Sequence, residues 1–127
     1  MKYLGIDFGS KRVGVATSDE EGKMAFPYSV ILNGEKLFTE IDKIIKKEKI
    51  DKIVIGESKN FAGEPNAIMK EIEKFKKELQ DKTELKVIFE PEFMTSSQAE
   101  IIQGKNEMHD ASAAAIILQS FLDKNNT

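Results

Sequence analysis

The chain has 127 residues, with 19 Lys and Arg, 22 Asp and Glu, no Cys and a formal net charge of −3. The lack of Cys excludes thiol nucleophiles, zinc-thiolate centres and disulfides, and it fits the reducing cytosol. No segment resembles a membrane span or a secretory signal, so we expect a cytoplasmic protein of one domain over residues 1–127. The acidic balance excludes a broad basic surface, so any contact with nucleic acid must depend on a local basic patch.

The first predicted elements are two strands joined by a tight turn at residues 9–12. In the first strand, the apolar positions 4, 6 and 8 alternate with Tyr3, Gly5 and Asp7. A strand that buries the apolar set must turn Asp7 to the other face. Small residues at Gly5, Gly14 and Ala16 leave space on that face for a ligand or for another backbone. An ordinary hairpin that ends in a solvated acid is the alternative reading of this segment.

Strand and helix signals alternate through the rest of the chain. A strand over residues 23–30 contains Pro27, which suits an edge position. Apolar spacing then predicts a helix over 37–48, a strand over 52–55, a glycine-bounded loop over 56–63 and a helix carrying Ile68, Ile72, Phe75 and Leu79. A strand over 85–89 follows, then a short helix over 95–103 and a last helix from about residue 110 to 123. This order predicts an α/β fold with a five-stranded mixed sheet, three antiparallel strands and then parallel ones, flanked by helices.

Further acidic residues lie at the end of the fifth strand and at the start of the last helix. Glu90 and Glu92 surround Pro91, which is expected to end the strand, so one of the two acids should lie near the carboxyl edge of the sheet. Asp110 heads a stripe that must be buried against the sheet, formed by Ala113, Ala114, Ile117, Leu118 and Phe121. Taken alone, Asp110 is also a good helix N-cap, with His109 as its solvated neighbour.

These segments together resemble the YqgF/RuvX family, in order and over essentially the whole chain. The likeness is carried by residues 5–16 and 110–119, and less specifically by 54–56 and by Glu92 before 95–100. The resemblance implies an RNase H-like fold and a nuclease that matures the 5′ end of pre-16S rRNA, or alternatively a Holliday junction resolvase in DNA recombination and repair. It maps the metal-binding acids of the family to Asp7, Glu92 and Asp110.

The chain also departs from the family pattern in three places. Phe93 stands where the family usually has arginine, and Glu57-Ser58 stands where it usually has Leu-Pro. The stretch between residues 103 and 110 is shorter than the basic loop that relatives often carry. Losing the arginine removes a bidentate phosphate or carboxylate partner.

The three acids suit a divalent cation that prefers oxygen ligands. Without Cys or a persuasive His, Mg²⁺ or Mn²⁺ is favoured over zinc, and two ions about 3.5–4 Å apart can assist phosphodiester hydrolysis. Asp7 is expected to bridge both ions, with Glu92 and Asp110 each holding one; Glu90 remains an alternative to Glu92. Phosphate contacts are expected from Ser10, Lys11, Arg12, Lys59, Thr95 and Ser96, with Lys105 as a further candidate.

The low charge and the short loop favour a flexible RNA end over a DNA junction as substrate. The RNA could be held by the small ribosomal subunit, and the protein is expected to be a monomer or a weak homodimer that does not bind membranes. Two other classes stay open. One is an ATPase of the sugar-kinase and actin-like type, whose first phosphate motif resembles the Asp-Phe-Gly at residues 7–9. The other is a non-catalytic RNA- or ribosome-binding module.

Overall fold

The computed structural model describes residues 1–58, 69–92 and 109–125, and for residues 57, 58, 92, 109 and 110 it describes the backbone alone. The strands in this part of the chain are β1 (Tyr3–Phe8), β2 (Arg12–Ser18), β3 (Ala25–Leu32), β4 (Lys52–Ser58) and β5 (Lys86–Glu92). The helices are α1 (Leu37–Glu48), α2 (Met69–Thr83) and α4 (His109–Asn125). None of these helices is both long enough and apolar enough to cross a membrane.

The strands form one sheet in the order β3-β2-β1-β4-β5. The pairs β1–β2 and β2–β3 are antiparallel because short turns connect them, whereas β1–β4 and β4–β5 are parallel and are reached through helices. The five-stranded mixed sheet predicted from the sequence is therefore confirmed. The central position of β1 places Asp7 in the middle of the edge at which β1, β4 and β5 all end.

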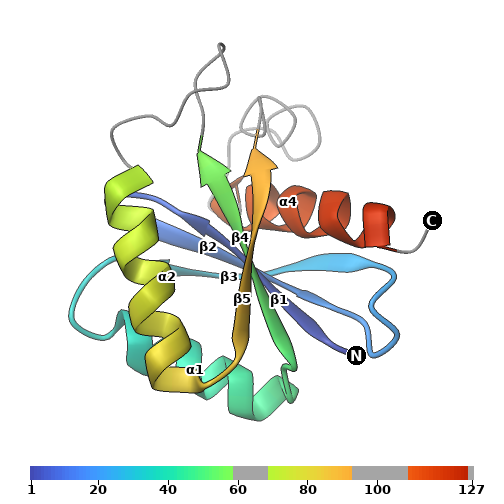
Figure 1. The fold of residues 1–127 in the computed structure, drawn as a ribbon, viewed down its shortest axis with the longest axis horizontal. Helices are drawn as coiled ribbons and strands as arrows, with labels where there is room; N and C mark the ends of the chain where they lie inside the picture. Colours follow the sequence, from blue (N-terminus) through green and yellow to red (C-terminus); the bar gives the residue numbers. More distant parts are fainter. Residues whose placement is uncertain (59–68, 93–108, 126–127) are drawn as a thin grey trace.

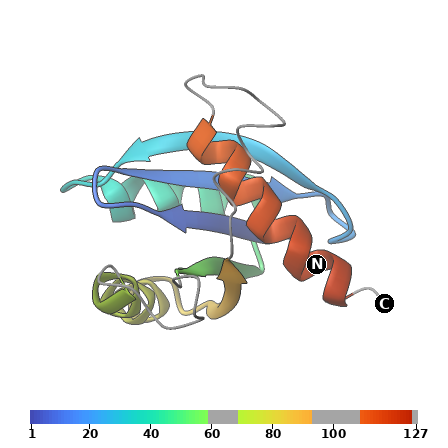
Figure 2. The same ribbon diagram turned by 90° about the horizontal axis from the view of Figure 1, so that it is seen from above.

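Helices cover both faces of the sheet (Figures 1 and 2). On one face, α1 and α2 pack against the larger core, which includes Leu4, Ile6, Ile41 and Ile72. On the other face, α4 lies across the sheet and contacts all five strands. The smaller core beneath α4 is formed by Tyr3, Ala16, Val54, Ala114, Ile117, Leu118 and Leu122.

The alternation of β1 decides which residues enter which core. Leu4 and Ile6 belong to the core under α1 and α2, while Tyr3 belongs to the core under α4. Each fully buried Leu or Ile contributes about 1.5–3 kcal/mol, so a one-residue slip of this strand would be strongly unfavourable. The face of Asp7 is thus fixed by the burial of its neighbours.

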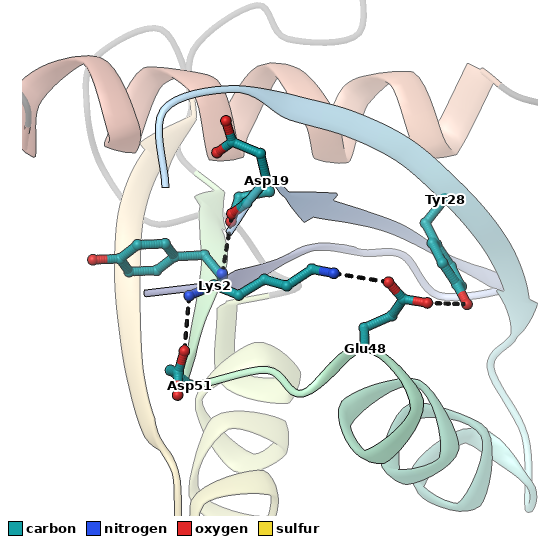
Figure 3. A network of polar contacts seen from close by, with 7 residues as sticks. Lys2, Asp19, Tyr28, Glu48 and Asp51 are labelled. Atoms are coloured by element: carbon teal, nitrogen blue, oxygen red, sulfur yellow. Dashed lines mark hydrogen bonds and ion pairs between the residues drawn. The ribbon is translucent and has the colours of Figure 1, made fainter. Parts of the chain in front are cut away.

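A polar network ties the start of β1 to α1 and β3 (Figure 3). The backbone N–H of Lys2 donates to Asp51 Oδ2 at 2.8 Å, and Lys2 Nζ donates to Glu48 Oε1 at 2.9 Å. Tyr28 in β3 donates its hydroxyl to Glu48 Oε2 at 3.4 Å. The hydrogen bond from Lys2 is the main cause that lowers the pKa of the Glu48 carboxyl. The end of β1 opposite to Asp7 is therefore anchored by a half-buried ion pair.

Strand boundaries differ from the sequence prediction in β3, β4 and β5. β3 begins and ends two residues later than the predicted range 23–30. Pro91 was expected to end the fifth strand, but β5 continues through Pro91 to Glu92 and pairs it with Glu57 of β4. The prediction was wrong because β5 is an edge strand, where a missing backbone N–H is tolerated. β4 is longer than predicted and includes residues 56–58, which had been assigned to a loop. The remaining loop residues and the short helix predicted over 95–103 lie outside the described residues.

Candidate active site

Asp7 lies at the carboxyl end of β1, on the face covered by α4. Its antiparallel partner in β2 is Gly14, which has no side chain to occupy the space beside the carboxylate. Asp7 is half-buried. The predicted position of this acid is therefore confirmed, on a strand whose other members fix its direction.

The backbone of α4 comes unusually close to β1 at Gly5. A Cβ atom added at Gly5 would lie 2.7 Å from Leu118 Cβ and 3.1 Å from the carbonyl oxygen of Ala114. Real Cβ atoms essentially never approach another heavy atom to 2.7 Å, so only glycine fits here without a shift. The space that the sequence predicts on this face of β1 is thus occupied, at Gly5, by the backbone of α4.

The contacts along β1 give the direction of α4. Tyr3 packs against Phe121 with ring centroids 5.5 Å apart, and Gly5 meets Leu118 and Ala114. Moving along β1 toward Asp7 therefore means moving along α4 toward its N-terminus. Residue 110 lies one helical turn before Ala114, so the first turn of α4 continues toward the Asp7 end of β1.

Residue 110 itself belongs to the helix. Because α4 begins at His109, Asp110 lies inside the first turn and not at the N-cap position that the sequence left open. Its side chain and that of His109 lie outside the described part of the chain. The geometry therefore brings the positions of Asp7 and Asp110 toward the same edge without defining how their carboxylates meet.

Glu90 and Glu92 both lie in β5, at the same edge of the sheet. Glu90 pairs with Gly56 and Glu92 with Ser58 of β4. The Glu90 side chain is only 5% exposed, and its Oε2 accepts hydrogen bonds from Ser120 Oγ at 2.9 Å and Lys124 Nζ at 2.7 Å. This ion pair gives Glu90 a structural role in holding α4 against β5. The Glu92 side chain is not among those described.

The β1–β2 turn presents the predicted phosphate-binding residues Ser10, Lys11 and Arg12, all of them exposed. Asn33 fixes the shape of this turn: its Nδ2 donates to the Gly9 carbonyl at 2.8 Å, and its backbone N–H donates to the Lys11 carbonyl at 2.9 Å. A Cβ at Gly9 would lie 2.5 Å from the Arg12 carbonyl oxygen, so this position also requires glycine. The remaining predicted contacts, Lys59, Thr95, Ser96 and Lys105, lie outside the described residues.

Three polar features at α4 were not found from the sequence. One is the Glu90–Lys124 pair. Another is Gln119, which links α4 to the start of β3: its side chain accepts a hydrogen bond from the backbone N–H of Ala25 at 2.8 Å and donates one to the carbonyl of Lys23, just before β3, at 2.9 Å. In the first turn of α4, Ser112 is 3% exposed, and its hydroxyl has no hydrogen-bond partner among the described residues. A buried hydroxyl of this kind is expected to have a partner, such as a water molecule or an ion.

The predicted ligands, three carboxylates, have the chemistry that a hard divalent cation requires. Carboxylates and hydroxyls are the ligands that Mg²⁺ and Mn²⁺ prefer. Among the side chains that are described, no three acids or histidines gather closely enough to bind a metal, since two of the three predicted ligands are outside that set. The chemistry of the predicted ligands therefore supports this cation class, and the coordination stays a prediction.

Comparison with known proteins identifies the family of this chain. A family model described as RuvX, Holliday junction resolvase, matches residues 1–124. The chain belongs to this family. The resemblance stated from the sequence motifs is thereby confirmed.

Curated relatives of the RuvX chain span nearly its full length. A protein of Sulfurihydrogenibium sp. (strain YO3AOP1), named "Putative pre-16S rRNA nuclease", is 40% identical over 97% of this chain and 90% of its own. A protein of Nitratidesulfovibrio vulgaris (strain DSM 19637 / Miyazaki F) with the same name is 35% identical over 97% of this chain and 94% of its own. The expected enzyme class, a nuclease, is thus the class named for the family.

Solved structures confirm the RNase H-like fold. RuvC of T. thermophilus in complex with a Holliday junction substrate has a TM-score of 0.63 and 13% identity, over 99% of this chain and 96% of that one. The Fowlpox virus resolvase in complex with Holliday junction DNA also has a TM-score of 0.63, with 12% identity over the whole of both chains. At these identities the likeness establishes the architecture and nothing finer.

Proposed function

We propose that this RuvX-family chain is a metal-dependent nuclease that processes the 5′ end of pre-16S rRNA in the cytoplasm. The observation that carries the proposal is the course of α4. Its contacts with Tyr3 and Gly5 run antiparallel to β1, so the helix turn that contains residue 110 continues toward the half-buried Asp7. The two relatives, each named "Putative pre-16S rRNA nuclease", support the choice of substrate.

In this proposal Asp7, Glu92 and Asp110 hold two Mg²⁺ or Mn²⁺ ions. When bound, such a pair makes the attacking water more acidic and stabilises the leaving oxygen. Residue 92 is two positions beyond Glu90, and positions two apart on a strand belong to one face of the sheet. Because Glu90 is already paired with Lys124, we assign the ligand role to Glu92.

The residues of the β1–β2 turn position the substrate. Lys11 and Arg12 attract the phosphates on either side of the scissile bond, and Ser10 donates a hydrogen bond to a phosphate oxygen. These groups project from a turn that Gly9 and Asn33 hold in one shape, so little order has to be gained when RNA binds. These three side chains can contact only a few phosphates, which suits binding to a short stretch of single-stranded RNA. In this proposal the small ribosomal subunit is the partner that holds the rest of the RNA.

A Holliday junction resolvase is the second candidate, because that is the description of the matching family model. A junction has four duplex arms, and neutralising their phosphates supplies much of the binding free energy. A net charge of −3 gives this chain few means to do so. A non-catalytic RNA-binding module is the third candidate, and it would bind the precursor without cutting it.

One experiment separates the three candidates. The purified protein is incubated with a pre-16S precursor and with a synthetic four-way junction, with Mn²⁺ and with chelator. We expect Mn²⁺-dependent trimming of the RNA 5′ extension, lost in Asp7→Asn and kept in the matched control Asp81→Asn, an exposed acid on α2. Symmetric nicks in the junction beside intact RNA would replace the proposal with a resolvase, and binding without cleavage of either would leave a binding module.

A further inference from the structure

A cavity of about 350 Å³ opens on the opposite side of the sheet from Asp7. It lies beside the β1–β2 turn, between the start of α1 and residues 71–78 of α2. Phe8 and Ser10 line it from β1 and the turn, next to Asp7 in the sequence. The same short segment thus supplies both the candidate catalytic acid and one wall of the cavity.

Three phenylalanines from three different elements form the apolar wall of this cavity. Phe75 of α2 is buried, and it packs against Phe8 with ring centroids 4.8 Å apart and against Phe38 of α1 at 5.4 Å. Phe8 and Phe38 are half-buried, and Lys82 Nζ lies 5.1 Å from the centroid of the Phe38 ring, so a base that stacks on Phe38 takes the place of this lysine. Rings held in place by other rings offer a rigid surface on which a planar group can stack at low entropic cost.

The polar rim of the cavity is acidic. Glu71, Lys74 and Glu78 line it from α2, giving two carboxylates for one ammonium. Such a rim disfavours a phosphate group. Carboxylates instead accept hydrogen bonds from the exocyclic amino groups of nucleobases. An aromatic wall with an acidic rim therefore favours a neutral planar ligand that carries N–H donors.

We propose that this cavity binds one unpaired nucleobase of the RNA strand whose phosphodiester lies at Asp7. The proposal rests on the proposed function and names its substrate class as single-stranded RNA with an amino-bearing base, cytosine, adenine or guanine, near the scissile bond. Asp7 and Phe8 are consecutive and lie on opposite faces of the sheet. An RNA strand that passes over the carboxyl edge of the sheet can therefore contact both residues. A base inside a duplex cannot enter, because it would have to leave its stack.

Binding of short RNA oligonucleotides to the full chain tests the inference, followed by fluorescence anisotropy in chelator so that the RNA stays intact. We expect an oligocytidine to bind more tightly than an oligouridine, because uracil lacks the amino group. Stacking of one base on an aromatic ring changes affinity by roughly five- to a hundredfold or more, so Phe38→Leu should weaken binding about fivefold or more. Phe38→Tyr, which keeps the ring, should bind like the unmodified chain.

The rim is tested separately with variants that leave the apolar core intact. Glu71→Gln combined with Glu78→Gln should reduce the preference for cytidine, because a neutral amide oxygen accepts a hydrogen bond more weakly than a carboxylate, without weakening oligouridine binding. The matched control Glu73→Gln with Asp81→Asn removes the same two negative charges from exposed residues of α2 that do not line the cavity, and it should leave the preference for cytidine unchanged. Should Phe38→Leu fail to fold, the rim variants alone decide.

The outcomes separate this inference from the nuclease proposal. Equal binding of both oligonucleotides by the unmodified chain, or unchanged binding in folded Phe38→Leu, overturns the base pocket. If the same preparation still trims the precursor with Mn²⁺, the nuclease proposal stands without it. A cytidine preference that depends on residues 38, 71 and 78 in a chain that cuts no RNA supports the pocket and refutes the nuclease.

Discussion

Replacing Gly5 with Ala tests the contact on which the candidate site depends. The new methyl group would lie 2.7 Å from Leu118 Cβ, about 0.7 Å short of ordinary contact at 3.4 Å, and 3.1 Å from a backbone carbonyl that cannot rotate away. Overpacking of this kind costs typically about 1–3 kcal/mol. At roughly 4 °C per kcal/mol for a chain of this size, we expect the melting temperature to fall by about 4–12 °C.

The same change should lower cleavage more than it lowers stability. Relief of the clash moves α4 away from β1, and residue 110 moves with it relative to Asp7. A displacement of 1 Å in a catalytic arrangement can cost about a hundredfold in rate, so a loss of about tenfold or more is expected under conditions in which the variant is fully folded.

Three further variants make the measurement specific. Gly34→Ala is the matched control, since a Cβ there would meet nothing within 4 Å, and its stability should stay the same or rise slightly. Leu118→Gly, which removes the Cβ atom itself, should be destabilising on its own, yet the double variant with Gly5→Ala should be more stable than the sum of both losses by about 1 kcal/mol or more. Urea unfolding of the parent and of the four variants gives these values. A Gly5→Ala protein as stable as the parent would refute the close approach and, with it, the argument that α4 brings residue 110 toward Asp7.

Three other predictions concern charges. Asp7→Asn should leave the metal-free protein as stable as the parent or more stable, because the change removes repulsion among clustered acids. It should also abolish the rise in melting temperature that Mg²⁺ causes in the parent. A clear loss of metal-free stability would mean that Asp7 is structural. Lys124→Met should cost about 1–2 kcal/mol in urea unfolding, since among the described residues it leaves the buried Glu90 carboxylate with Ser120 alone as a hydrogen-bond partner, whereas addition of Glu90→Gln should recover part of that loss. The lowered pKa of Glu48 contributes stability that is present above its ordinary value of 4.5 and is lost as the pH falls through its folded value, so Lys2→Met should flatten the acid side of a melting-temperature profile; an unchanged profile would contradict this.

The sequence was sufficient for features that depend on local periodicity. Alternation in β1 predicted the face of Asp7 because Leu4 and Ile6 are too costly to expose, and the apolar spacing of residues 37–48 matched α1 in both boundaries. The order of the elements then limited the sheet to very few topologies. These are constraints that neighbouring residues impose on one another.

Features that depend on how elements cross could not be predicted in this way. Glu90 and Glu92 are indistinguishable in the sequence, and the partner that separates them, Lys124, is 34 residues away on a helix whose angle to the sheet has no local signal. Pro91 reads as a strand end unless β5 is known to be an edge strand. The wall of Phe8, Phe38 and Phe75 likewise forms only when three elements meet.

The attachment of α4 has a consequence for its dynamics. Alanines let the helix approach closely, but they bury little apolar area, and the core beneath it is the smaller of the two. Hydrogen bonds from Gln119 to β3 and from Lys124 to β5 provide further contacts between the helix and the sheet. Amide hydrogens of α4 should therefore exchange with solvent through local opening before those of β1 and β4 do. A cation bound by both Asp7 of β1 and Asp110 of α4 would hold the helix to the sheet and slow this exchange. Metal loading of the proposed site would therefore be accompanied by stronger protection of the α4 amides.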